Sequence, residues 1–127
     1  MSLTIKDPET LKKLSKAKGS GAGMLEGCGA AVAVFADSEK ADTWIEDCSI
    51  AMSFMMLMAQ EQGIGCCWSQ IHLRTGKDGS DAEQNVKDIL SVPDKYRIAG
   101  ILSLGLPAEE PKAHTIDEAD MGKVRFV

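Results

Sequence analysis

The sequence predicts an α/β or α+β domain of three layers with a central sheet. Two continuous apolar runs, Ala30–Ala36 and Ile98–Leu106, are typical of strands that are buried on both faces. Helical patterns alternate with extended segments in the order β-α-β-α-β-α-β. The chain has 127 residues, of which 44% are hydrophobic and 26% charged, so its length and composition indicate one globular domain over residues 1–127.

The chain is expected to begin with a short extended segment, Leu3–Ile5, followed by a helix that starts near Pro8. Leu11 and Leu14 form the apolar stripe of that helix. The glycines from Gly19 to Gly29 end it, and the run Gly19–Gly23 is interpreted as a flexible connection. The solvated face of the helix is expected to carry Lys12, Lys13, Lys16 and Lys18.

A long helix is predicted from about Asp42 to Gln62. Thr43 and Glu46 are spaced as a capping box, and Gly63 supplies a left-handed stop. Between Cys48 and Ala59 nearly every residue is apolar, so every face of this helix needs cover. A domain of this size encloses such a helix poorly by itself. We therefore expect one face to pack on the sheet and another on a second subunit, which predicts a homodimer.

The second half of the chain continues the alternation and ends in a polar tail. Its expected elements are an extended segment Ile64–Ile71, a polar loop Arg74–Asp81, an amphipathic helix Asp81–Leu90, the buried strand Ile98–Leu106, a proline-bearing tail Pro107–Asp120 and a closing segment Gly122–Val127.

Composition argues against several classes of function. The net charge of −5 disfavours nucleic acid as a partner. The four cysteines lie in or beside apolar runs and lack the spacing of a zinc site or a disulfide framework, so buried thiols in a reducing compartment are expected. No signal peptide opens the chain, and no apolar stretch is long enough to span a bilayer. These observations predict a cytoplasmic protein that binds no metal.

Most local motifs favour a structural interpretation. The run Gly19–Gly23 follows a lysine-rich helix rather than a strand, which argues against dinucleotide binding. Gly76 and Lys77 lack the remainder of a phosphate-binding loop. His72 and His114 stand alone and are expected in loops or on the surface. The methionines at positions 52, 55, 56 and 58 fit a core or a dimer seam.

The segment Gly63–Gln70 is the strongest candidate for a binding site. It follows the long helix and contains small residues, then Trp68, then polar residues. Small side chains allow a planar ligand to approach the backbone and to bond exposed N–H groups. An ordinary helix cap that continues into a strand explains the same residues equally well.

Three motifs in this order resemble the FMN-dependent (NAD(P)H) nitroreductase family, matching the C-terminal two thirds of its members. The segment Gly63–Trp68 resembles the family's Gly-Leu-Gly-Ser-Cys-Trp motif after its dimer helix. The strand exit Leu104–Glu110 resembles a Leu-Gly-Tyr-Pro-Ala-Glu motif. The closing segment carries a basic pair, Lys123 and Arg125, as family members do.

The resemblance implies a three-layer nitroreductase-like sandwich with a long buried dimer helix, and an intertwined homodimer that binds FMN between its subunits. Family members pass a hydride from NAD(P)H through FMN to nitroaromatic, quinone or similar acceptors. By this resemblance Lys123 and Arg125 hold the phosphate. No catalytic residue is assigned, since the flavin carries the redox chemistry. The residues expected along the flavin ring are Cys67, Trp68, Ser69 and Gln70.

The sequence departs from the family pattern at two places. Ser69 and Gln70 stand where the family often has Ile-Gly. The arginine-rich opening of the family, which grips the FMN phosphate, and the helical region after it have no counterpart here. We therefore expect residues 1–127 to form one domain that is N-terminally truncated relative to the family. The alternative is a flavin-free, nonenzymatic dimeric domain that keeps the fold.

Overall fold

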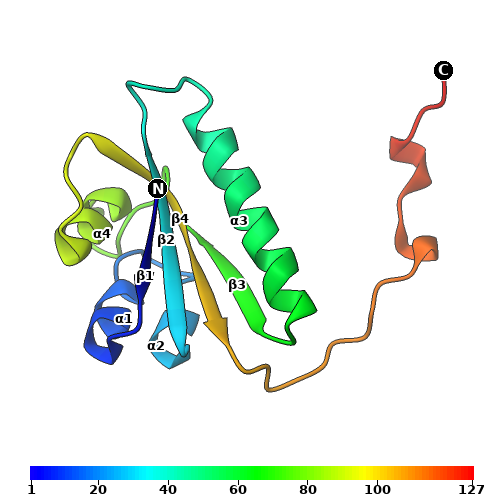
Figure 1. The fold of residues 1–127 in the computed structure, drawn as a ribbon, viewed down its shortest axis with the longest axis horizontal. Helices are drawn as coiled ribbons and strands as arrows, with labels where there is room; N and C mark the ends of the chain where they lie inside the picture. The colour runs from blue at the N-terminus through cyan, green and yellow to red at the C-terminus, as the bar shows by residue number, and fades with distance from the viewer.

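Four strands form the sheet, and every neighbouring pair is antiparallel. In the computed structural model, which describes residues 1–127, the strand order is β1-β2-β4-β3 (Figure 1). The strands are β1 (Ser2–Ile5), β2 (Ala30–Asp37), β3 (Gly65–Gln70) and β4 (Tyr96–Gly105). The two continuous apolar runs are therefore the central pair, β2 and β4, and most of their residues are buried as predicted.

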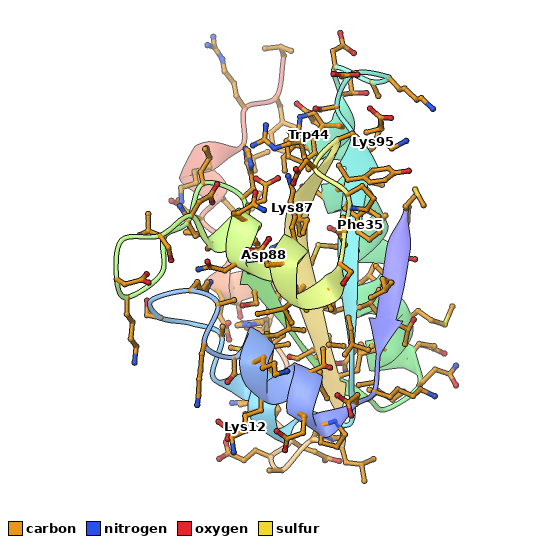
Figure 2. All side chains as sticks on the ribbon, turned by 90° about the vertical axis from the view of Figure 1, so that its left-hand side faces the viewer. Lys12, Phe35, Trp44, Lys87, Asp88 and Lys95 are labelled. Atoms are coloured by element: carbon orange, nitrogen blue, oxygen red, sulfur yellow. The ribbon has the colours of Figure 1, made fainter.

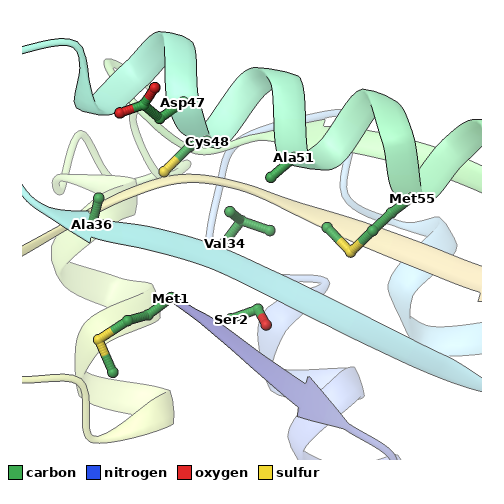
Figure 3. A pocket seen from close by; sticks show the side chains of 8 residues that line it. All are labelled: Met1, Ser2, Val34, Ala36, Asp47, Cys48, Ala51 and Met55. Carbon is green, nitrogen blue, oxygen red and sulfur yellow. The ribbon is translucent and has the colours of Figure 1, made fainter.

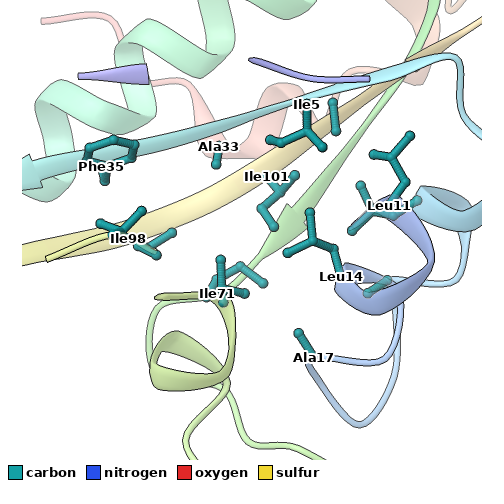
Figure 4. Packing of buried hydrophobic residues seen from close by; sticks show 14 residues of the cluster. Ile5, Leu11, Leu14, Ala17, Ala33, Phe35, Ile71, Ile98 and Ile101 are labelled. Carbon is teal, nitrogen blue, oxygen red and sulfur yellow. The ribbon is translucent and has the colours of Figure 1, made fainter. Parts of the chain in front are cut away.

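One face of the sheet is covered by α1 (Pro8–Leu14), α2 (Met24–Gly27) and α4 (Ala82–Leu90). Side chains from these helices and from the sheet meet in one apolar cluster (Figure 4). Charged residues such as Lys12 and Asp88 lie on the outer surface of this layer (Figure 2). The cluster contains Ile5, Leu11, Leu14, Ala17, Ala22, Leu25, Ala31, Ala33, Phe35, Ile71, Val86, Val92, Ile98 and Ile101.

The glycine-rich region between α1 and β2 is more ordered than the sequence suggested. It contains the short helix α2, whose Leu25 is fully buried. Gly19 N–H donates to the Thr75 carbonyl at 2.9 Å, which fastens the loop to the segment after β3. The interpretation of Gly19–Gly23 as a flexible connection was wrong, because the hydrogen bond of Gly19 and the burial of Ala22 in the core hold this run in place.

The other face of the sheet is covered by a single helix, α3 (Trp44–Glu61). Cys48 and Met52 pack against β2 and β4, which confirms that one face of the helix lies on the sheet. Figure 3 shows Cys48 and Met55 above β2, beside a hollow of about 430 Å³ that extends to Met1. The helix ends at Glu61, and Gly63, just beyond the C-cap residue Gln62, has a φ of +68°, the left-handed conformation that the sequence predicted.

The predicted capping box at the start of α3 is absent. Thr43 makes no capping hydrogen bond to the backbone, and its hydroxyl instead bonds the Asp47 carboxylate at 3.2 Å. Thr43 is nonetheless the N-cap residue, and the helix begins at Trp44, two residues after the predicted start at about Asp42. No helix is both long and apolar enough to cross a membrane.

The chain beyond β4 runs away from the sheet (Figure 1). Its only regular elements are two 3₁₀ turns, η1 (Ile116–Glu118) and η2 (Met121–Lys123). Nearly all of its side chains are exposed, including the apolar Ile116 and Phe126. A single chain therefore leaves this tail without a packing surface.

Candidate functional site

The segment Gly63–Gln70 forms β3 at the edge of the sheet, where it pairs only with β4. Just beyond the strand, Ile71 N–H donates to Ala99 O at 3.2 Å. Because the pairing direction alternates along an antiparallel strand, the N–H groups of Cys66, Trp68 and Gln70 point away from β4. The open edge therefore presents a row of backbone donors and acceptors.

Trp68 lies on the face of β3 that is covered by α3 and is half-buried there. Its indole Nε1–H donates to Gln70 Oε1 at 2.9 Å, so the two side chains form one unit. Gly100 of the neighbouring strand makes room for this unit. A Cβ at that glycine would lie 3.0 Å from Trp68 Nε1 and 2.9 Å from the Ser69 carbonyl oxygen.

Ser69 and Cys67 lie on the opposite face of β3. Ser69 is fully buried, and its hydroxyl donates to the Gly21 carbonyl at 2.8 Å. Cys67 is exposed. The ring segment that the sequence predicted is thus divided between two faces, because successive side chains of a strand alternate. Its four residues lie along the same edge strand, but their side chains do not form one surface.

A buried lysine lies at the end of this edge. Lys18 has only 9% of its surface exposed, and its Nζ donates to Gln70 O at 2.9 Å. Burial, together with the charge of Arg74, lowers the pKa of Lys18 below its usual value. Lys18 was predicted to lie on the solvated face of the first helix, and its burial shows that this prediction was wrong. Lys18 lies beyond the end of α1 at Leu14, so the helical pattern gave no signal for its burial.

The thiols near the edge differ in environment. Burial, and then the neighbouring Cys67, raise the pKa of Cys66, whose Sγ contacts the Met56 carbonyl at 3.9 Å. Burial likewise raises the pKa of Cys48. Only Cys67 is both exposed and on the candidate edge.

His72 follows β3 but belongs to a separate charged cluster. Its Nδ1 lies 3.6 Å from Glu83 Oε2 and 3.4 Å from an Arg97 nitrogen. Its side chain is only 17% exposed, so the expected loop histidine is largely covered. His114 lies on the exposed tail as expected. No group of three or more His, Cys, Asp or Glu residues is placed to hold a metal ion.

The predicted phosphate pair lies apart from β3 within one chain. Lys123 and Arg125 are exposed on the tail, and Lys123 forms an ion pair only with Asp120, at 3.5 Å. Figure 1 shows this end of the tail well away from β3. The structure therefore brings together Cys67, Trp68, Ser69 and Gln70, while the basic pair remains separate.

The edge of β3 suits a flat, polar ligand. Outward N–H groups can bond its acceptor atoms, and the Lys18 ammonium adds a positive charge at one end. None of the four predicted ring residues, Cys67 to Gln70, is a histidine or carries a carboxylate that could act as a general base. The site can thus bind and orient a cofactor, which would have to supply the chemistry itself.

Comparison with known proteins decides the family. The family model described as Nitroreductase family matches residues 2–106. The chain belongs to the nitroreductase family. It is 30% identical over 120 residues to an Archaeoglobus fulgidus protein described as an NADH dehydrogenase/NAD(P)H nitroreductase. The matched region covers 91% of this chain. The resemblance predicted from the sequence is confirmed.

Solved structures confirm the nitroreductase fold. A protein described as an FMN-dependent nitroreductase from Clostridium difficile R20291 is 38% identical and superposes with a TM-score of 0.96, covering 99% of this chain and 73% of that chain. A Parabacteroides distasonis structure with 20% identity gives a TM-score of 0.86, covering 99% of this chain and 71% of that chain.

The chain of this nitroreductase-family protein is shorter than its curated relatives. It spans 66% of the Archaeoglobus fulgidus protein and 60% of a Methanothermobacter thermautotrophicus relative that is 27% identical over 121 residues. The matched residues nonetheless include all four strands and α1 to α4.

Proposed function

We propose that this nitroreductase-family chain is part of a flavin-dependent oxidoreductase that uses FMN. The open edge of β3, with its outward N–H groups and Lys18 at one end, is the observation that carries the proposal. The similarity to a protein described as an FMN-dependent nitroreductase supports the choice of cofactor. When bound, FMN supplies the redox chemistry, taking a hydride from NAD(P)H and reducing a nitroaromatic, quinone or similar acceptor.

The residues of β3 fit a flavin in a specific way. The backbone N–H groups of Trp68 and Gln70 would bond ring acceptors along the strand edge. The Trp68–Gln70 hydrogen bond holds the Gln70 side chain in place, and the buried Ser69 hydroxyl fixes the strand to the glycine-rich loop. Cys67 would line the ring on its exposed side. These residues position the cofactor, and none of them is assigned a proton-transfer role.

The proposal includes a homodimer formed through α3. The helix face opposite the sheet carries a stripe of exposed apolar residues, which water alone would cover in a monomer. The tail, with its exposed Phe126 and Val127, has no packing surface in its own chain. In an intertwined dimer, Lys123 and Arg125 would reach the FMN phosphate beside the partner. The stripe consists of Ile50, Phe54, Leu57 and Met58.

We further propose that residues 1–127 behave as one domain and that the protein works in the cytoplasm. The four cysteines are all free, which agrees with a reducing compartment.

Flavin titration tests the function. Apo protein is titrated into FMN while flavin fluorescence and absorbance are followed, and the complex is then reduced anaerobically with NADH or NADPH. Reoxidation by a nitroaromatic compound and by a quinone identifies the acceptor class. Spectra that stay those of free FMN at the highest soluble protein concentration would show that the proposal is wrong.

A pair of tail variants tests the phosphate assignment. Lys123→Ala and Arg125→Ala each remove one charge-assisted hydrogen bond, so FMN affinity should fall by about tenfold in each. Lys112→Ala removes an exposed lysine from the same tail and serves as the matched control. Equal affinities in all three variants would remove the basic pair from the site.

A further inference from the structure

The chain leaves β3 through a strained turn. Leu73, three residues beyond the end of the strand at Gln70, has a φ of +56°. A side chain at such a φ crowds the following carbonyl oxygen, so residues other than glycine rarely adopt it. The Leu73 side chain is 77% exposed, so its own packing does not hold the turn. Strain of this kind persists only where neighbouring contacts fix the backbone.

The two residues before Leu73 are fixed by their side chains. Ile71 is fully buried in the apolar cluster that the sheet shares with α1 and α4. The His72 side chain is only 17% exposed. Its ring lies edge-on against the ring of Trp44, with the centroids 4.9 Å apart and the planes at 87°. Because His72 adjoins Leu73 directly, it is the fixed side chain nearest to the strained residue.

The His72 imidazole also makes polar contacts with two other elements. Its Nδ1 lies 3.4 Å from Arg97 Nη2 on β4. A guanidinium carries donors only, so Nδ1 accepts this hydrogen bond. Glu83 Oε2, in the first turn of α4, lies 3.6 Å from the same nitrogen, and Glu83 also pairs with Arg97. The ring therefore ties the turn to α4 and β4 as well as to α3.

The turn in its present form holds the Gln70 side chain. Gln70 Nε2 donates to the His72 carbonyl oxygen at 3.4 Å, while Gln70 Oε1 accepts from the Trp68 indole at 2.9 Å. The His72 carbonyl belongs to the peptide that joins His72 to Leu73. If the imidazole were released, Leu73 would relax toward a negative φ and turn this carbonyl away from Gln70. The orientation of the Gln70 amide thus depends on the strained residue.

We propose that His72 is a positioning residue for the edge of β3. Its imidazole keeps the turn at Leu73 in the strained conformation, and the strained turn keeps the Gln70 amide in one orientation. The consequence for catalysis rests on the proposed function, because a fixed Gln70 amide matters to the reaction only if the flavin lies along this edge. His72 follows the strand and acts through Gln70.

NMR spectra of the flavin-free chain of 127 residues test this role. His72→Phe keeps a ring against Trp44 but removes the nitrogen that accepts a hydrogen bond. The Gln70 side-chain amide and Trp68 indole resonances should shift in this variant. His72→Asn places an amide oxygen near the position of Nδ1 and should restore the wild-type resonances. His114→Phe, on the exposed tail, is the matched control and should shift neither.

A second substitution tests the strain itself. Glycine adopts a φ of +56° without a side-chain clash, so a turn with Leu73→Gly has little strain to release. His72→Phe should therefore move the Gln70 resonances less than half as far in the Leu73→Gly background as in the wild type, which is a coupling that a double-mutant cycle measures. His72→Leu removes the same nitrogen with a smaller side chain and takes the place of His72→Phe if the larger ring prevents folding.

Three results would overturn the proposal in the flavin-free chain. The first is a His72→Phe spectrum with wild-type Gln70 resonances. The second is a His72→Asn spectrum that matches that of His72→Phe. The third is an equal shift with and without Leu73→Gly, because His72 would then not act through the strained turn.

Titration with FMN connects the turn to the proposed function. His72→Phe should weaken FMN binding about fivefold, the effect of losing one neutral hydrogen bond, and His72→Asn should bind like the wild type. Unchanged affinity in His72→Phe would overturn the positioning role at the flavin edge. A wild type that binds no FMN would refute the proposed function instead, and the flavin-free spectra distinguish the two failures.

Discussion

Glu83 holds Arg97 through two parallel hydrogen bonds, with Nε 2.8 Å from Oε1 and Nη2 3.1 Å from Oε2. The same carboxylate accepts the Ile98 N–H at 2.9 Å, which ties the first turn of α4 to β4. Lys87 Nζ lies 3.8 Å from it. Arg97 in turn lies over the Trp44 ring at the start of α3. One buried carboxylate therefore joins both helical layers to the sheet. Lys87 and Trp44, which belong to this cluster, are labelled in Figure 2.

Glu83→Gln should destabilise the fold by about 2 kcal/mol. The amide cannot accept two charge-assisted hydrogen bonds from Arg97 and also the Ile98 N–H, and it leaves the buried Lys87 without a counter-ion. Urea unfolding measures the change. Glu9→Gln, at an exposed position in the first turn of α1, is the control and should change stability by less than about 0.5 kcal/mol.

Acid should weaken the wild type through the same carboxylate. Burial alone would raise the pKa of Glu83, but the hydrogen bonds from Arg97 and Ile98 N–H and the charges of Arg97 and Lys87 lower it below its usual value. A lowered pKa contributes stability above the unfolded value of about 4.3 and loses it as pH falls through the folded value. The stability difference between wild type and Glu83→Gln should therefore shrink below about pH 4 in urea titrations. A constant difference down to acid-induced unfolding would contradict this origin.

The strongly patterned parts of the fold follow from the sequence. The central strands were predicted correctly because a short, continuous apolar run bounded by glycine or polar residues is typical of a buried strand. The position of α3 and the packing of one of its faces on the sheet followed from its length and its apolar surface. The segment Gly63–Gln70 was chosen from motif order, since the resemblance and its small residues pointed to the same stretch, and its extended part is β3. Its place along a flavin ring stays a prediction.

The remainder depends on contacts between residues distant in the chain. The burial of Lys18 comes from Gln70, more than fifty positions away, and no local pattern records that contact. The face that each ring-segment side chain occupies depends on the register with β4. The predicted capping box does not form, because the Thr43 hydroxyl bonds the Asp47 carboxylate instead of the backbone, although the spacing of Thr43 and Glu46 was favourable.

Gly100→Ala should disturb the candidate site from the neighbouring strand. The added Cβ would lie 2.9 Å from the Ser69 carbonyl oxygen and 3.0 Å from Trp68 Nε1, so β3 or the indole must shift. We expect a loss of about 1–3 kcal/mol in stability and a changed Trp68 fluorescence spectrum. Gly27→Ala, where a Cβ meets nothing within 4 Å, is the control and should leave the spectrum unchanged.

Phe54→Glu should abolish the proposed dimer without unfolding the chain. Phe54 is 67% exposed on the face of α3 opposite the sheet, whereas Met55 and Met56 pack partly against the sheet and would confound the test. A buried charge at a subunit interface opposes association. Sedimentation should show a dimer for wild type and a monomer for the variant. Gln60→Glu, also exposed on α3, is the control for added charge, and a monomeric wild type would remove the dimer from the proposal.

Cys67 should react with a thiol reagent before the other cysteines, and FMN should protect it. It is the exposed thiol of the chain, whereas burial raises the pKa values of Cys48 and Cys66 and keeps their thiolate fractions low. Mass spectrometry after a short exposure to iodoacetamide locates the modified residue. Saturating FMN should slow labelling at Cys67 and leave the half-buried Cys28 unaffected, since Cys28 lies near α2 rather than on β3. If FMN binds and Cys67 labelling is unchanged, the flavin ring does not cover this part of β3, and its site must lie elsewhere on the chain.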